Sequence, residues 1–340
     1  MSASGRSRAL IAAGLLAVVA GCLPMTPASR RDILTIGAYS VLREAVHEGL
    51  IPAFARTWKA QTGRDATFEE SYNASGAQSR AIAAGFDADV AMLSLEDDIT
   101  PLVNAGLVAE TWRRNEHKGM ITRSLVVVGV RPGNPTGIKD WPDLAKQGVG
   151  VLYPDPKTSG GARWNINAIY GAGLLGDRSG PPNPKAAKAL MNDVQNNVVN
   201  MDSSGRQSLG TFERGTGDAV VTYENELNLR LSRSGSEAGM ESVIPPRTLL
   251  IEGPAAIVDT SVARHGNREL AEAFLAFVRG PEGQRILKDY GFRSLTEPLP
   301  RGTYTMTDLG GWAKVKAEVY GPKGLWTSIF TDRKAKAAAR

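Results

Sequence analysis

The sequence has 340 residues, of which 42% are hydrophobic and 22% are charged, and this composition is typical of a globular protein with a sizeable core. Its formal net charge is +5, but the basic residues are spread along the chain and the densest late cluster is its C-terminal tail, so a nucleic-acid partner is not predicted. The three histidines, His47, His117 and His265, lie far apart in the sequence, so no metal site is predicted either.

The first 21 residues look like an export signal. Two arginines precede an apolar run, residues 9–20, which is too short for a membrane-spanning helix because such a helix needs ~20 apolar residues. The run ends at VAGC, which resembles the lipobox of bacterial lipoproteins. We therefore expect diacylation of Cys22 and a tether, residues 22–31, that anchors the protein to a membrane outside the cytoplasm, in the periplasm or at the cell surface. The alternative is a plain signal peptide with an incidental cysteine.

Beyond residue 31, short apolar runs alternate with helical patterns. Strands are expected at 33–39, 65–70, 88–95, 124–130, 148–154 and 218–226, and a last strand precedes two helices within 256–291. Helices are expected over 43–60, ending at Gly63, and over 75–85. This alternation predicts an α/β fold with parallel sheets. No low-complexity linker divides the chain, so we expect two lobes that share crossing strands.

Three serine–glycine turns lie between a strand-like run and a helical pattern: Ser75-Gly76, Ser159-Gly160-Gly161 and Ser204-Gly205. The start of a helix exposes unpaired backbone N–H groups and a partial positive charge, which together favour an anion. Glycine lets these amides approach a ligand closely, and a serine hydroxyl adds a donor. The simpler interpretation is that each serine only caps its helix.

Two enzymatic interpretations are not favoured. GAGLLG, residues 171–176, has the glycine spacing of dinucleotide-binding folds, but it follows a helical segment and therefore ends a helix instead of opening one. No cofactor is predicted. Ser159 lies in no nucleophile elbow and has no local base, so a secreted serine hydrolase is a minor alternative to a protein that is not an enzyme.

A family resemblance begins at residue 134, in NPTGIKDWPDLAKQGVGVLYPDPKTSGGARWN. This stretch resembles the periplasmic sulfate/thiosulfate-binding proteins of ABC importers, whose hallmark is a Pro-Lys-Ser/Thr-Ser-Gly-Gly-Ala-Arg-Trp-Asn run. The likeness extends over nearly the whole chain beyond the signal. It implies a two-lobed periplasmic-binding-protein fold of type II, in which each lobe has a central, mostly parallel sheet flanked by helices and the ligand lies in the cleft. Lobe 1 would comprise residues 32–122 and 247–340, and lobe 2 residues 123–246.

The resemblance also implies a ligand site made largely of backbone amides. Two positions depart from the family pattern, because Ser40 replaces an aspartate and Tyr223 replaces a tryptophan. Arg163 and Arg206 follow two of the turns, and in the family such residues pair with acidic groups. The implied ligand-binding residues are Ser40, Ser75, Ser159, Gly160, Gly161, Gly205 and Tyr223.

The implied function is the capture of sulfate, thiosulfate or both by a monomer that delivers the anion to an ABC permease. The two departures leave open another oxyanion, such as molybdate or an organic sulfonate.

Overall fold

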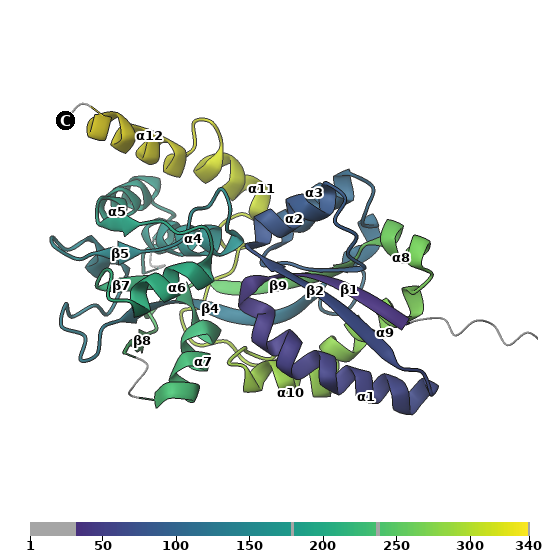
Figure 1. Ribbon diagram of the computed structural model, residues 1–340. Coiled ribbons are helices and arrows are strands. Elements are labelled where there is room, and N and C mark those ends of the chain that lie inside the picture. The colour runs from purple at the N-terminus through teal and green to yellow at the C-terminus, as the bar shows by residue number, and fades with distance from the viewer. Residues whose placement is uncertain (1–31, 178–179, 236–238, 339–340) are drawn as a thin grey trace, which may run out of the picture. The chain divides into compact units, whose positions relative to one another are not determined.

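The computed structural model describes residues 32–177, 180–235 and 239–338 (Figure 1). The expected signal peptide, the tether and Cys22 lie outside the described residues. Within the described ranges, none of the helices has the length and apolar character needed to span a membrane.

The described strands form one mixed sheet in the order β2-β1-β3-β9-β4-β7-β5-β6, with β8 paired to β4. Pairing is parallel within β2-β1-β3 and within β7-β5-β6, and antiparallel wherever β4 or β9 takes part. The strands are β1 (Asp32–Tyr39), β2 (Ala66–Asn73), β3 (Val90–Met92), β4 (Met120–Val130), β5 (Val151–Leu152), β6 (Val198–Asn200), β7 (Ala219–Tyr223), β8 (Glu241–Val243) and β9 (Leu250–Ile257).

Helices flank this sheet, which confirms the predicted α/β fold. Helices α2 and α9 both contact β1, and α4 and α6 both contact β7 (Figure 1). The helices are α1 (Ile51–Thr62), α2 (Ser75–Ala83), α3 (Glu96–Asn104), α4 (Gly160–Leu175), α5 (Pro184–Asn196), α6 (Gly205–Glu213), α7 (Glu224–Ser234), α8 (Asp259–His265), α9 (Arg268–Arg279), α10 (Pro281–Asp289), α11 (Trp312–Val315) and α12 (Leu325–Ala338).

Strands β4 and β9 join the two groups of parallel strands. The first half of β4 pairs with β9 from Met120 to Leu125, and its second half, Val126 to Val130, pairs with β7. Strand β9 pairs with β4 up to Pro254 and then with β3. Strand β9 therefore connects to the first group through β3, β4 connects to the second through β7, and their mutual pairing joins the two groups, as expected for crossing strands. The lobe boundaries at residues 122/123 and 246/247 stay a prediction.

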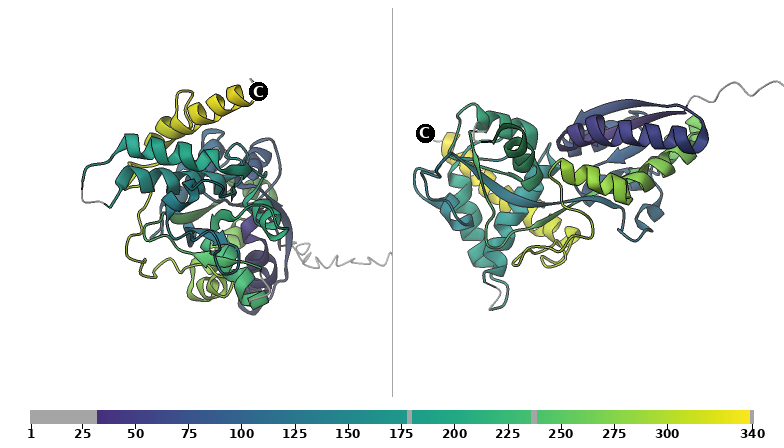
Figure 2. Two further views of the ribbon diagram at one scale, coloured as in Figure 1. Left: turned by 90° about the vertical axis from the view of Figure 1, so that its left-hand side faces the viewer. Right: turned by 90° about the horizontal axis from the view of Figure 1, so that it is seen from below.

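Several element bounds differ from the sequence-based expectation. The run 88–95 contributes only the three residues of β3, because the Ser94 amide turns away and donates to the Ser75 hydroxyl at 2.9 Å. The expected helix over 43–60 contains a π-helical segment, Ala45–Leu50, which packs against α10 (Figure 2). A methyl group on Gly49 would lie 2.6 Å from Ile286 of α10, so this contact is tight.

Two predicted helix ends are confirmed. Gly63 ends α1 with a left-handed φ of 72°, a conformation that glycine adopts without strain. The glycine-rich run 171–176 closes α4, with Gly176 as its C-terminal cap, so it opens no dinucleotide-binding turn. The sequence pattern that resembled a cofactor motif is therefore the end of a helix.

Candidate functional site

Each of the three serine–glycine turns begins a helix, as predicted. Helix α4 begins at Gly160, and the Ser159 hydroxyl accepts a bond from the Ala162 amide at 3.4 Å. Helix α6 begins at Gly205 and is capped in the same way by Ser204, at 3.2 Å. Helix α2 begins at Ser75 itself, with no side-chain cap. Capping therefore accounts for one role of Ser159 and Ser204, but it does not account for Ser75.

The start of α4 lies against the segment that follows β3. A methyl group built on Gly160 would lie 2.8 Å from Ser94 Oγ, 2.8 Å from Asp98 Oδ2 and 2.7 Å from the Leu95 side chain. Real carbon atoms do not approach so closely, so only glycine fits at this position without a shift of its neighbours. The backbone of α4 and residues 94–98 are thus in direct contact.

Tyr223 lies beside the same turn. A methyl group on Gly161 would be 3.5 Å from the Tyr223 hydroxyl, an ordinary contact distance. That hydroxyl lies 2.8 Å from Ser94 Oγ, and the carbonyl of Ser94 accepts a bond from Trp164 Nε1 at 2.8 Å. Ser94 therefore connects the ends of β3 and β7 with helix α4.

Both tyrosines at this site remain protonated. Burial raises the pKa of Tyr223 well above its usual range, and burial likewise raises the pKa of Tyr39, whose ring centre lies 6.4 Å from that of Tyr223. A neutral phenol can donate a hydrogen bond to an anion without bringing a charge of its own.

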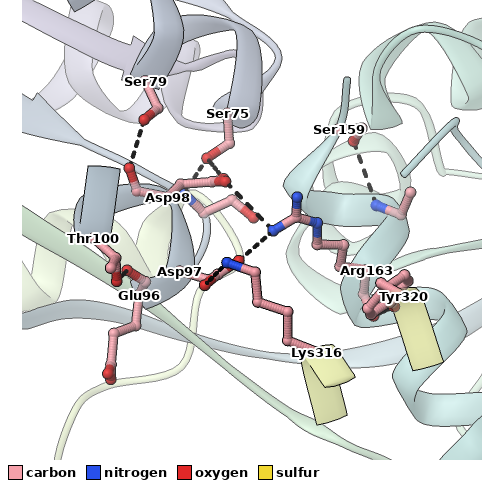
Figure 3. Close-up of polar contacts among 12 residues, drawn as sticks. Ser75, Ser79, Glu96, Asp97, Asp98, Thr100, Ser159, Arg163, Lys316 and Tyr320 are labelled. Atoms are coloured by element: carbon pink, nitrogen blue, oxygen red, sulfur yellow. Dashed lines mark hydrogen bonds and ion pairs between the residues drawn. The ribbon is translucent and has the colours of Figure 1, made fainter. Parts of the chain in front are cut away.

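Ser75 is bonded to a buried carboxyl group (Figure 3). Its hydroxyl donates to Asp98 Oδ2 at 2.5 Å and accepts from the Ser94 amide. Asp98 is only 4% exposed, and burial raises its pKa above the usual value, although Arg163 opposes the shift. Ser79 Oγ donates to the Asp98 carbonyl at 2.6 Å, which holds the first turn of α3 against α2.

The two arginines that follow the turns have acidic partners, as expected. Arg163 donates to Asp97 at 2.7 Å, and Lys316 reaches the other oxygen of Asp97 at 2.9 Å (Figure 3). Arg206 donates to both oxygens of Glu44, at 2.5 and 2.8 Å, and also to the buried Glu226. These cations are therefore largely compensated by carboxylates before any ligand is considered.

Ser40 and Gly205 lie on the Arg206 side of the site. Ser40 begins a 3-10 turn, Ser40–Leu42, directly after Tyr39, and α6 packs against this turn. A methyl group on Gly205 would meet no atom within 4 Å, so there is open space beside the first residue of α6. The structure thus brings Ser75, Ser159, Gly160, Gly161 and Tyr223 together, and it places Ser40 beside α6. Their role in binding stays a prediction.

The sequence-based analysis missed Ser94 and Asp98. Their position in the sequence could have indicated them, because both follow β3 at its carboxyl end, where ligands bind in α/β sheets. The histidines take no part: His47 contacts Glu70, His117 contacts Glu116 and His265 contacts Asp89. In the ranges that the structure covers, no three His, Cys, Asp or Glu residues are placed to hold a metal ion.

Comparison with known proteins gives consistent matches. Residues 34–293 match the family model described as bacterial extracellular solute-binding protein. The chain is 38% identical over 308 residues to a sulfate-binding protein of Synechococcus elongatus, covering 87% of this chain and 86% of the relative. It is 36% identical over 339 residues to a thiosulfate-binding protein of Pseudomonas aeruginosa, covering 96% of this chain and 98% of the relative.

A solved structure agrees with these sequences. The sulfate-binding protein SubI from Mycobacterium tuberculosis H37Rv is 35% identical, with a TM-score of 0.76 over 85% of this chain and 99% of that chain. This likeness confirms the expected periplasmic-binding-protein fold. The chain therefore belongs to the family of bacterial extracellular solute-binding proteins, and within it to the group of the sulfate- and thiosulfate-binding proteins.

Proposed function

We propose that this protein captures sulfate or thiosulfate outside the cytoplasm and delivers it to an ABC permease without chemical change. The observation that carries the proposal is the meeting of two helix starts, at Ser75 and Gly160, beside the neutral hydroxyl of Tyr223. Helix starts bind anions through backbone N–H groups and the helix dipole. The names of the relatives support the choice of sulfur oxyanions.

The chemistry of the donors supports a fully deprotonated anion. Sulfate presents only acceptors, which backbone amides and hydroxyl groups satisfy. Hydrogen phosphate carries a proton that needs an acceptor, and leaving it unpaired in a buried site costs about 1–3 kcal/mol. Ser40, which replaces an aspartate of the family pattern, removes one candidate acceptor. Molybdate and organic sulfonates remain the alternatives that the departures at Ser40 and Tyr223 allow.

A secreted serine hydrolase is the second candidate, and the geometry does not favour it. Ser159 accepts a bond from a backbone amide, and each of the three histidines pairs with a carboxylate. No base is therefore positioned to activate this hydroxyl.

We expect calorimetric titration of residues 32–340 with an oxyanion panel to give binding of sulfate, thiosulfate or both, and hydrogen phosphate to bind at least about tenfold more weakly. The same samples should show no turnover of ester substrates. Binding of molybdate alone would select the alternative ligand, and hydrolysis that depends on Ser159 would select the hydrolase.

A second prediction concerns the glycine at the start of α4. Gly160→Ala should weaken sulfate binding by about 2 kcal/mol, because the added methyl group forces α4 away from Ser94 and Asp98. Gly205→Ala is the matched comparison, since it also changes the first residue of a helix but has free space around it, and it should lose far less affinity. Titration calorimetry measures both variants. Equal losses of sulfate affinity in the two variants would show that the close packing around Gly160 is not needed for binding.

We further propose that the protein closes on its ligand as two lobes, residues 32–122 with 247–340 and residues 123–246, hinged at the crossing strands β4 and β9. A ligand that touches both lobes stabilises the closed form. The radius of gyration of the ligand-free protein should therefore decrease when sulfate is added, as measured by small-angle X-ray scattering. An unchanged radius at saturating sulfate would contradict this hinge.

Finally, we propose that a lipid on Cys22 anchors the monomeric protein to the membrane. Cys22→Ala should abolish incorporation of a labelled fatty acid in cells and release the protein from the membrane fraction, because two acyl chains suffice for stable anchoring. An unlabelled wild-type protein would instead indicate a plain signal peptide.

A further inference from the structure

We propose that Asp98 is a positioning residue that directs the Ser75 hydroxyl, so that binding of an oxyanion is coupled to protonation of Asp98. The inference rests on the proposed function, because it takes Ser75 as a donor to the bound anion. It concerns a residue that does not itself need to touch the ligand.

The reasoning starts from the bonds that Ser75 makes. A serine hydroxyl has one hydrogen and two acceptor lone pairs. The Ser94 amide donates to Ser75 Oγ at 2.9 Å and occupies one lone pair. Asp98 Oδ2 lies 2.5 Å from the same oxygen, so one hydrogen is shared between these two groups (Figure 3). Whether Ser75 keeps its own hydrogen for a ligand depends on the state of Asp98.

The two states of Asp98 give opposite results. If the carboxyl group is ionised it can only accept, so Ser75 must donate to it and has no hydrogen left for an anion. If the carboxyl group is protonated, Asp98 donates to the second lone pair of Ser75, and the serine hydrogen can point toward the ligand. Protonation of Asp98 therefore leaves the Ser75 hydroxyl hydrogen available to donate to a ligand.

The position of Asp98 makes its charge important for the ligand. Its Oδ2 atom would be 2.8 Å from a methyl group on Gly160, so the carboxyl group lies beside the first residue of α4. An ionised carboxylate at this place repels an anion held by the α4 amides, and the low dielectric of a buried site strengthens the repulsion. Both the hydrogen count and the charge therefore favour the protonated acid in the complex.

The surroundings only partly compensate an ionised Asp98. Arg163 is the nearest cation, at 3.9 Å from Oδ1, but it lies closer to Asp97, at 2.7 Å. Burial raises the pKa of Asp98, and the adjacent Asp97 acts in the same direction. The charged or titratable groups that face Asp98 are Arg80 on α2, Asp97 on α3, Arg163 on α4 and Tyr223 at the end of β7, with Lys316 held on Asp97.

Anion binding and protonation of Asp98 favour each other. The bound anion favours protonated Asp98, so the pKa of Asp98 is higher in the complex than in the free protein. Between these two values, binding takes up as much as one proton. Affinity is therefore full below the pKa of the free protein and falls about tenfold per pH unit as the pH rises above it.

The test is calorimetric titration with sodium sulfate across a pH series, in buffers that differ in their heats of ionisation. The wild-type protein should take up a proton on binding, and its affinity should fall as the pH rises. Asp98→Asn should bind sulfate with no proton uptake and with the same affinity at every pH, because the asparagine amide donates to Ser75 as the protonated acid does. The wild-type measurement needs no variant and so decides the question even if Asp98→Asn does not fold.

The matched control is Asp97→Asn, which removes the neighbouring carboxylate but leaves Asp98 in place. The sulfate affinity of this variant should fall with rising pH as steeply as that of the wild type. The fall should begin at lower pH, because the loss of a nearby negative charge lowers the pKa of Asp98. Sulfate binding without proton uptake by the wild type, or a loss of affinity in Asp98→Asn at every pH, would overturn the inference and leave the proposed function standing. If neither protein binds sulfate or thiosulfate, the proposed function fails and the inference fails with it.

Discussion

At Gly160 the first turn of α4 lies against residues 94–98 with space for a hydrogen atom but not for a methyl group. The other features of the site depend on this contact. It brings the start of α4 to the start of α2, because Ser94 and Asp98 are both bonded to Ser75. It also brings Tyr223 to Ser94. Two helix starts can act on one anion only if nothing larger than a backbone separates them.

Around this contact the cations are paired and the tyrosines are neutral. Arg163 and Arg206 both lie one helical turn or less from a candidate donor, but each is paired with carboxylates. The buried tyrosines remain neutral, since burial raises the pKa of both phenols. A site of this kind recognises its ligand by the number and direction of hydrogen bonds, and so it distinguishes anions that differ in whether they carry a proton.

The mixed sheet supplies the connection about which the proposed lobe closure would occur. Strand β9 pairs with β3 of one group, β4 pairs with β7 of the other, and β4 and β9 pair with each other, so the two groups of parallel strands are joined through this strand pair and not by a flexible linker. In the proposed closure, rotation about these two strands would move each half as a rigid unit. The ion pairs of Arg163 with Asp97 and of Arg206 with Glu44 join residues far apart in the sequence, and they would break and reform in such a motion.

The sequence by itself determined the local chemistry of this protein. Hydrophobic periodicity predicted the α/β fold, and the serine–glycine turns predicted three helix starts, because glycine spacing and capping are properties of a few consecutive residues. It did not determine the length of β3 or the π-helical segment Ala45–Leu50, which depend on packing against distant elements. Nor did it reveal Ser94 and Asp98 as parts of the site. Their partners Ser75 and Tyr223 lie 19 to 129 residues away in the sequence. Only the tertiary contact of α2, α4 and β7 therefore shows which hydrogen bonds these hydroxyl groups make.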